Sequence, residues 1–424
     1  MKKGILFLMI VSFLLVLQSC NNDDTPEEPQ MENHEPTITV SPDQMIVRFA
    51  ASLSEDDRIA IRNESNVTNF KKCDCGNENI ELWGIDPSVL AVESTVRGLR
   101  ERHRGEAEGD YQFSFTLPNI TNFEVPDAII PSDIIQFTSN TLDPETVTIA
   151  VIDTGLDYRK YFDAGGLLYQ DPGAPDCEPE DPEQTHTSGW NFIDNTGTSL
   201  DLNGHGTYVT KLITSSLEDK GIDYRIMPIQ AFNENGEGSL WDIVCAIGYL
   251  QRVKAEGGSI DIVNASFGGT IEKELFENNG LLSTMIGELQ NDMLFVASAG
   301  NEGIDTDRSN LRHFPSGFTA ENIIGVGGYI ENGSTINMHP ESNYGNLSID
   351  IAVPFDGYSI PLDDSANIDL RGTSYSAARI SALVSEYYIN NGKPNPINLK
   401  NQFLSTATST PALQDSIHSG RVLR

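Results

Sequence analysis

Short apolar runs alternate with amphipathic stretches in the first part of the chain. Three runs rich in β-branched and aromatic residues are predicted strands: Met45–Phe49, Ile80–Ile85 and Tyr111–Phe115. One helix is predicted to begin after Ser54, because acidic residues fill the turn that follows it, and a second is predicted over residues 87–102. Strands and helices in this order predict a small α+β unit over residues 43–117.

The pattern changes near residue 147, where the apolar runs lose their polar alternation. Three of these runs are predicted strands that are buried on both faces: Val147–Ile152, Asp261–Asn264 and Met293–Ala297. Helical patterns accompany them after His205, over residues 241–254 and 281–290, and after Ser374. Strands that alternate with helices predict an α/β fold, in which a parallel sheet lies between two helical layers over residues 147–424.

Two further segments lack a periodic pattern. Four prolines are spread over residues 118–146, which predicts an irregular linker between the two units. Residues 20–42 are rich in Asn, Asp, Glu and Pro, so they have little apolar surface to bury. We expect this second segment to be a flexible, acidic spacer.

The first residues have the features of an export signal. Lys2 and Lys3 precede an apolar run that is shorter than the roughly 20 residues of a membrane-spanning helix. Leu17–Cys20 resembles a bacterial lipobox, so residues 1–19 are expected to be removed and Cys20 to carry lipid. A plain secretory signal with an incidental cysteine is the alternative. The prediction is an exported bacterial lipoprotein that is anchored to a membrane, and the acidic residues after Cys20 favour display on the cell surface.

The overall charge narrows the range of partners. The chain has 27 basic and 62 acidic residues, for a net charge of −35. Such a field repels phosphate, so nucleic acid is excluded as an expected partner. The acidic surface is either simply solvated or attracts cationic peptides.

The cysteines suggest disulfides and do not form a metal-binding pattern. Besides Cys20, they are Cys73, Cys75, Cys177 and Cys245. Export permits disulfides, but the pairing cannot be read from the spacing. Scattered cysteines without a histidine cluster are a poor zinc signature, so no structural metal is expected.

Two motifs supply a carboxylate and an imidazole. Asp153 ends an apolar strand, at the edge where α/β sheets place their sites, although aspartates also end strands for loop reasons. His205 lies between two glycines at the start of a helical pattern, where the helix dipole favours the neutral ring. A capping histidine with a purely structural role is the alternative.

Two further motifs supply a nucleophile and an amide donor. Ser374 opens a long apolar helix two residues after a glycine, and Asn301 lies in a glycine-lined turn after an apolar strand. Separately these residues could be a helix cap and a turn former. Together with the preceding motifs, they match the groups needed to cleave an amide: nucleophile, base, orienting carboxylate and oxyanion donor.

The motifs in the order Asp, His, Asn, Ser resemble those of the subtilisin, or subtilase, family. The resemblance implies a serine endopeptidase with a three-layer catalytic domain, with Ser374 as nucleophile, His205 as base, Asp153 as its orienting carboxylate and Asn301 as oxyanion donor. It also implies substrate-binding segments. Their residues are Gly236 and Gly238 on one side of the peptide, and Ser266, Phe267 and Gly268 on the other. Glu302 is placed by the pocket for the residue before the cut, where it could favour Lys or Arg.

The resemblance carries further expectations. The unit over residues 43–117 is similar to the ferredoxin-like inhibitory propeptide of the family, with a permanent accessory domain as the alternative. Tyr375 departs from the methionine that usually follows the nucleophile, and the loop after Leu217 is too short for the calcium loop of many relatives. Because this loop is short, calcium has no identified site, and no cofactor is expected. A monomer that acts on peptides or proteins is predicted. Two rival functions are a catalytically silent binding protein with the same fold, and a structural surface lipoprotein whose motifs are coincidental.

Overall fold

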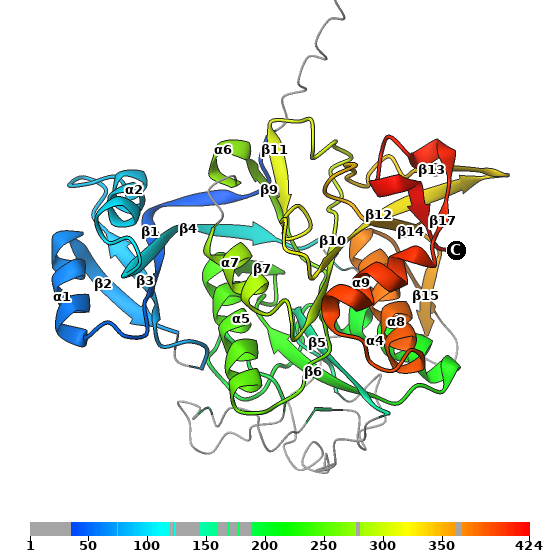
Figure 1. The fold of residues 1–424 in the computed structure, drawn as a ribbon, viewed down its shortest axis with the longest axis horizontal. Helices are drawn as coiled ribbons and strands as arrows, with labels where there is room; N and C mark the ends of the chain where they lie inside the picture. The colour runs from blue at the N-terminus through cyan, green and yellow to red at the C-terminus, as the bar shows by residue number, and fades with distance from the viewer. Residues whose placement is uncertain are drawn as a thin grey trace, which may run out of the picture.

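A computed structural model describes residues 35–424 except 74, 119, 121–122, 124–144, 159–167, 170–176, 178–187, 277–279 and 362–366 (Figure 1). The predicted signal, Cys20, most of the spacer and most of the linker lie outside the described residues. Among the described helices, none is both long and apolar enough to cross a membrane.

The N-terminal unit contains two helices and four antiparallel strands. Its elements in chain order are β1 (Thr39–Phe49), α1 (Glu55–Glu64), β2 (Val67–Lys72), β3 (Ile80–Ile85), α2 (Val92–Arg102) and β4 (Ala107–Thr116). The sheet order β2-β3-β1-β4 in a βαββαβ chain is ferredoxin-like, as predicted. The Oγ atom of Ser54 caps α1 by accepting a hydrogen bond from the backbone N of Asp57 at 3.2 Å.

Two details of this unit differ from the prediction. Strand β2 was not predicted, because it is a mostly exposed edge strand without an alternating apolar pattern. Helix α2 begins at Val92 and not at Pro87, since residues 86–90 form a turn. Asp86 makes this turn by accepting hydrogen bonds from the backbone N and the hydroxyl of Ser88 at 2.9 and 2.6 Å.

The second unit is built on a nine-stranded sheet of order β17-β18-β14-β12-β10-β8-β5-β6, with β13 paired to β12. The strands are β5 (Val147–Asp153), β6 (Tyr224–Gln230), β8 (Ile262–Ala265), β10 (Leu294–Ser298), β12 (Ile323–Asn332), β13 (Thr335–Met338), β14 (Ile351–Pro354), β17 (Thr408–Ser409) and β18 (Arg421–Val422). From β6 to β18 the neighbours are parallel, whereas β13 and β17 pair antiparallel. The predicted parallel sheet is thus confirmed.

Alternate residues of the central strands face two different helical layers. In β5, Ala150 and Ile152 belong to the core that includes α5 (Leu240–Ala255) and α7 (Leu281–Glu288). Ile149 and Val151 belong to the core that includes α4 (His205–Lys220), α8 (Thr373–Asn390) and α9 (Pro396–Ser405). Both faces of the sheet are therefore covered, which explains why its strands have no polar alternation (Figure 1).

Smaller elements complete this unit. They are β7 (Glu237–Ser239), β9 (Gly269–Glu272), α6 (Lys273–Phe276), β11 (Leu311–Phe314), β15 (Tyr358–Pro361), β16 (Asn367–Leu370), and the 3-10 turns Pro411–Leu413 and His418–Gly420. Strand β11 pairs with β9, and β15 pairs with β16.

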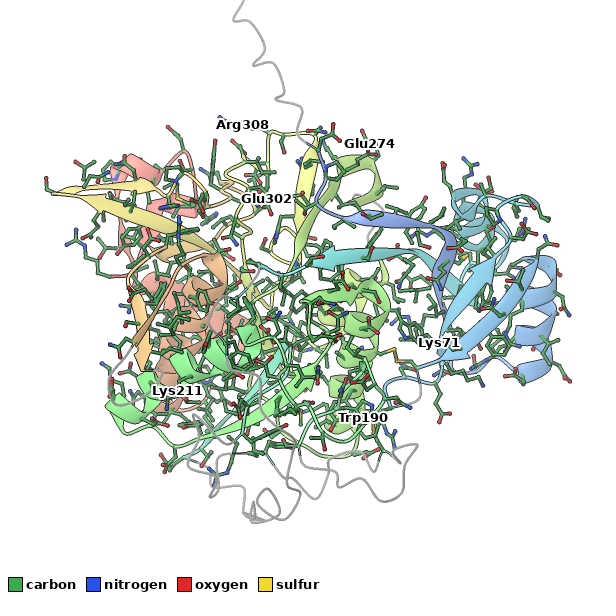
Figure 2. All side chains as sticks on the ribbon, turned by 180° about the vertical axis from the view of Figure 1, so that it is seen from behind. Lys71, Trp190, Lys211, Glu274, Glu302 and Arg308 are labelled. Carbon is green, nitrogen blue, oxygen red and sulfur yellow. A yellow bond between two sulfur atoms is a disulfide. The ribbon has the colours of Figure 1, made fainter. Side chains whose placement is uncertain are left out.

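The two units are joined by a shared strand pairing and a shared core. Strand β4 extends out of the N-terminal unit and pairs antiparallel with β7, so that Phe115 lies opposite Gly238 (Figure 1). One hydrophobic core runs from the N-terminal sheet to α5 and α7. At the same junction, the Lys71 Nζ atom lies 5.2 Å from the centre of the Trp241 ring (Figure 2).

Candidate active site

The carboxyl ends of three neighbouring strands bring the predicted residues to one edge of the sheet. Asp153 is the last residue of β5, Ser266 directly follows β8, and Asn301 follows β10 in a short turn. Helices α4 and α8 begin at this edge with His205 and Thr373. Parallel topology therefore gathers residues that are far apart in the sequence.

Asp153 and His205 form a buried pair. The Nδ1 atom of His205 is 2.8 and 3.0 Å from the two carboxylate oxygens of Asp153, and neither residue is exposed. The backbone N of Thr154 donates to the same carboxylate at 2.8 Å. A carboxylate at Nδ1 holds the proton there and leaves Nε2 as the basic nitrogen. Gly206 makes the close approach of α4 possible, since a Cβ there would lie 2.4 Å from the Gly155 carbonyl oxygen.

The charge around the imidazole controls its protonation. Burial favours the neutral ring, but the charge of Asp153, its hydrogen bond and the charge of Asp201 outweigh burial and raise the pKa of His205. The base therefore gains proton affinity from its acidic neighbours.

Asp201 is a residue of this site that the sequence reasoning missed. Its fully buried carboxylate accepts hydrogen bonds from the backbone N of Gly204 at 2.7 Å, the hydroxyl of Thr154 at 2.9 Å and the hydroxyl of Thr207 at 2.7 Å. It thus connects the end of β5 to the first turn of α4. An aspartate four residues before the histidine, in a loop with glycines, was the available signal.

Ser374 is held near the start of α8 by contacts with the chain after β8. Its hydroxyl donates to the Ser266 carbonyl oxygen at 3.0 Å, and the Ser266 hydroxyl donates to the Ser374 carbonyl oxygen at 2.8 Å. Asn264 donates to the Ser266 hydroxyl at 2.9 Å and accepts from Ser381 at 2.9 Å. This buried polar network fixes α8 against β8.

His205, Asn301 and Ser374 line one cavity of about 530 Å³. Within the described part of the chain, the buried Nε2 atom of His205 has no hydrogen-bond partner. The Ser374 hydroxyl is bound to Ser266 instead of this nitrogen. Nucleophile and base thus share a cavity but are not hydrogen-bonded to each other in this arrangement.

Asn301 is oriented by the residue that precedes the serine. Its Oδ1 atom accepts from the backbone N of Thr373 at 2.9 Å and from the Thr373 hydroxyl at 3.0 Å. The same hydroxyl accepts from the backbone N of Gly300 at 3.1 Å. Because Oδ1 is used in this way, Nδ2 is the side-chain group of Asn301 that is left to donate toward the cavity.

Tyr375, at the position that departs from the family pattern, packs beside the base. Its ring centre is 5.8 Å from that of His205, and both residues line the cavity. Burial raises the pKa of the Tyr375 hydroxyl, so it stays neutral. The aromatic side chain forms part of the wall against which the imidazole rests.

Three of the predicted substrate-binding residues, Gly236, Gly238 and Phe267, lie against the N-terminal unit, whereas Ser266 is hydrogen-bonded to Ser374. Gly238 pairs with β4, and the Gly236 carbonyl oxygen accepts a hydrogen bond from the backbone N of Leu117 at 2.8 Å. The Phe267 ring centre is 6.4 Å from that of Phe115. Neither these residues nor Gly268 and Glu302 are among those that line the cavity.

Glu302 and Gly268 have other neighbours. Glu302 lies in the segment that follows β10 and is labelled in Figure 2, and its carboxylate accepts a hydrogen bond from the Asn343 side-chain amide. Gly268 packs against the buried ring of His313, and burial lowers the pKa of this histidine to about 3. His313 is therefore neutral near neutral pH.

Among the described residues, no group of three or more His, Cys, Asp or Glu side chains is arranged to hold a metal ion. The hydrogen bonds described above, both between side chains and from side chains to the backbone, hold the geometry of the site.

Several known proteins are similar to this chain in sequence. A model of the subtilase family matches residues 145–420. The thermophilic serine proteinase of Bacillus sp. (strain AK1) is 26% identical over 354 residues, which are 81% of this chain and 77% of that protein. Alkaline serine exoprotease A of Vibrio alginolyticus is 22% identical over 369 residues, which are 87% of this chain and 56% of that protein.

A solved structure supports the fold over nearly the whole chain. The epidermin leader peptide processing serine protease of Staphylococcus aureus has a TM-score of 0.56 and is 12% identical, with 90% of this chain and 98% of that chain covered. The family model covers well over half of the sequence. The chain therefore belongs to the subtilase family of serine proteases.

Proposed function

We propose that this protein is a serine endopeptidase that uses Asp153, His205 and Ser374 as its catalytic triad. The observation that carries the proposal is the buried Asp153–His205 pair. Nε2 of His205 has no hydrogen-bond partner among the described residues, and His205 lines the same cavity as Ser374 and Asn301. A paired carboxylate, a neutral base and a hydroxyl at one edge of a sheet form the arrangement needed for acyl transfer.

In this mechanism, the Ser374 hydroxyl turns from the Ser266 carbonyl toward Nε2 of His205. Its oxygen attacks the substrate carbonyl carbon while Nε2 takes the proton, and Asp153 stabilises the imidazolium. Nδ2 of Asn301 and the backbone N of Ser374 donate to the oxyanion. His205 then gives the proton to the leaving amine, and water releases the acyl group by the same steps in reverse.

The N-terminal unit is proposed to act as an inhibitory propeptide. Strand β4 pairs with β7, and the Phe115 ring lies 5.5 Å from the Phe232 ring and 6.4 Å from the Phe267 ring, between the two segments assigned to substrate. Pro118 and Ile120 then line the cavity with His205 and Ser374. The chain's own segment thus lies where a peptide substrate is expected.

Two side chains of β4 strengthen this docking. Asp110 accepts from the backbone N of Leu281 at 2.6 Å, at the first residue of α7, and Gln112 accepts from the backbone N of Trp241 at 3.0 Å, in the first turn of α5. Both side chains satisfy amide groups that a helix start leaves unpaired. The N-terminal unit therefore supports the folded catalytic unit as well as covering its site.

The N-terminal region is proposed to export and anchor the enzyme. Lys2, Lys3, the apolar run and the lipobox-like Leu17–Cys20 support a bacterial lipoprotein with lipid on Cys20. Peptides or proteins outside the cytoplasm would then be its substrates. The proposal includes no cofactor and no calcium.

A serine-directed phosphonylating probe separates an enzyme from a silent binding protein. We expect the probe to label the wild-type chain at Ser374, because only a serine activated by a base reacts at a useful rate. Ser374→Ala is the matched control and should not be labelled. A wild-type protein that is processed and folded, yet unlabelled, would support the silent binding protein.

Replacing Asn301 by alanine tests the oxyanion donor. We expect kcat to fall about 10²- to 10³-fold with little change in KM, since the amide acts mainly on the transition state. Steady-state kinetics on a chromogenic peptide measure both constants. A rise in KM at unchanged kcat would assign Asn301 to ground-state binding instead.

The assignment of Glu302 to the pocket for the residue before the cut predicts a preference for basic side chains. Peptides that differ only at this position should be cleaved better with Lys or Arg than with Glu, and Glu302→Gln should reduce the difference. If basic residues are the poorest substrates, Glu302 has only its structural contact with Asn343.

A further inference from the structure

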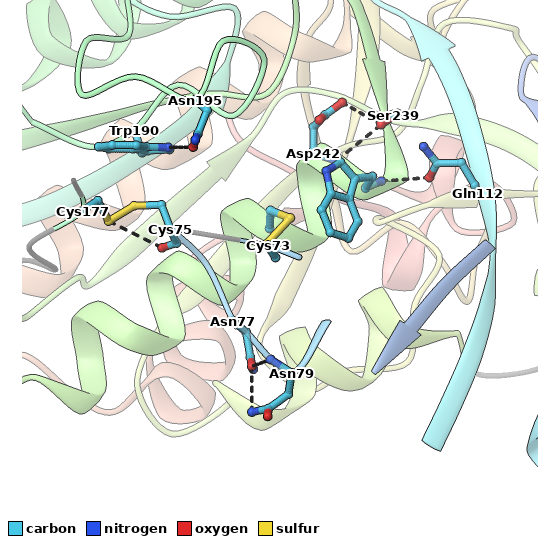
Figure 3. Close-up of a disulfide and its surroundings, with 12 residues drawn as sticks. Cys73, Cys75, Asn77, Asn79, Gln112, Cys177, Trp190, Asn195, Ser239 and Asp242 are labelled. Atoms are coloured by element: carbon cyan, nitrogen blue, oxygen red, sulfur yellow. Dashed lines mark hydrogen bonds between the residues drawn. A yellow bond between two sulfur atoms is a disulfide. The ribbon is translucent and has the colours of Figure 1, made fainter. Parts of the chain in front are cut away.

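Two disulfides join the N-terminal unit to the catalytic unit. Cys73 is bonded to Cys245 and Cys75 to Cys177, with Cα–Cα distances of 5.6 and 5.5 Å. Figure 3 shows the disulfide bonds, with Cys73, Cys75 and Cys177 labelled. The two cysteines of each pair are far apart in the sequence, by 172 residues for Cys73–Cys245 and by 102 residues for Cys75–Cys177.

Both disulfides join the turn between β2 and β3 of the N-terminal unit to the catalytic unit. Cys73 and Cys75 belong to the turn between β2 and β3, which lies in the N-terminal sheet. Cys245 lies on α5, and Cys177 also comes after the linker. Within the described residues, every cysteine is thus bonded to the other unit, and no disulfide lies within a single unit.

The disulfides lie in a closely packed and buried interface. The four cysteines are 2%, 3%, 6% and 2% exposed, for Cys73, Cys75, Cys177 and Cys245 respectively. Gly76 lies directly on α5, since a Cβ there would be 2.6 Å from the Cys245 carbonyl oxygen. The turn is stiffened by the Asn77 side chain, whose Oδ1 atom accepts from the backbone N of Asn79 at 3.0 Å (Figure 3). Burial of this kind protects the bonds from exchange with small thiols.

We propose that the N-terminal unit remains covalently attached after maturation, so that the mature enzyme consists of two disulfide-linked chains. The inference rests on the proposed function, because it assumes that the linker is cut. Hydrolysis of one peptide bond within residues 118–146 adds one water and yields a carboxylate and an amine. Both sulfur–sulfur bonds remain unchanged by this step.

Covalent attachment changes how the site becomes free. A propeptide that is cut from its enzyme can diffuse away, whereas a tethered one remains at an effective concentration of the order of millimolar. The body of the N-terminal unit thus stays on α5. Only the segment that follows β4, with Pro118 and Ile120, can leave the cavity. The unit is therefore a permanent part of the peptidase, and its inhibition ends when this segment leaves the cavity.

The experiment uses the full chain in an inactive background. Ser374→Ala, with the recognition sequence of a site-specific protease inserted within residues 118–146, is cut by that protease and analysed by intact mass and by gels with and without reductant. We expect one species without reductant and two chains with it. Cys73→Ser/Cys75→Ser should release the N-terminal chain without reductant, under mild denaturation. Either single variant should keep the chains joined through the remaining disulfide.

This experiment does not depend on catalysis. A negative result would therefore rule out the disulfide tether without bearing on the proposed peptidase activity. Two separate chains without reductant under denaturing conditions would overturn the proposal. Peptide mapping of the unreduced wild-type chain provides a second test that needs no variant to fold. Cys73–Cys245 and Cys75–Cys177 linked peptides are expected, whereas a Cys73–Cys75 bond would contradict the tether.

Discussion

Replacing Ser374 by alanine is expected to lower kcat about 10⁶-fold, the size of loss known when subtilisin loses its nucleophile. The physical reason is that no other serine or threonine is among the residues that line this cavity with His205 and Asn301. The variant should also accumulate as an uncut chain if the linker is cut by the enzyme itself. Peptide hydrolysis measured with purified protein, and the mass of the accumulated chain, check both results.

A control keeps this prediction specific to catalysis. Ser376→Ala removes a nearby hydroxyl that donates to the Pro354 carbonyl oxygen at 3.0 Å, on the same helix but away from the cavity lining. Its kcat should stay within a few-fold of wild type. If Ser374→Ala retained substantial activity, the assignment of the nucleophile would be wrong.

The second large effect is expected for Asp153→Asn, with a loss of about 10⁴-fold in kcat. An amide keeps the shape of the carboxylate but donates to Nδ1 of His205, which forces the proton onto Nε2. The imidazole would then present a proton to Ser374 instead of accepting one. Kinetics near neutral pH measure this loss.

The pH dependence of the same variant provides an independent readout. Because Asp153 and Asp201 raise the pKa of His205, wild-type kcat/KM should fall as the pH decreases through a value above the ordinary histidine pKa of about 6.5. Asp153→Asn removes the larger of these two charge effects, so the decrease of kcat/KM on the acidic side of the pH profile (the acidic limb) should move to lower pH. An unchanged limb would mean that a group other than His205 controls it.

Much of the fold followed from local patterns. Val147–Ile152 is apolar at every position except Thr148, and this run became β5 of a sheet covered on both faces. Strand β2 could not be predicted in this way, because its stability comes from pairing with β3 and not from its own side chains. Edge strands carry little sequence signal when most of their residues face solvent.

The candidate site was predictable to the extent that short motifs marked it. Asp153, His205, Asn301 and Ser374 each stood beside glycines or at a strand end, and parallel topology brings them to one edge. Their catalytic roles remain predictions.

Contacts between distant segments could not be derived from the sequence. Asp201 acts through hydrogen bonds to three separate groups, and the pairing of Cys73 with Cys245 depends on how the N-terminal unit docks on α5. Local sequence contains neither relation. The contacts of Asp201 form when β5 and α4 pack within the catalytic unit, and the disulfide forms when the N-terminal unit packs on α5.

The shared core has a consequence for thermal unfolding. Met45 and Trp83 of the N-terminal sheet belong to the same apolar cluster as Leu250 and Met285 of α5 and α7. Neither unit can melt without exposing apolar surface of the other, and the free energy of that surface couples their transitions. We therefore expect both units of the uncut chain to unfold in one cooperative thermal transition, seen as a single calorimetric peak.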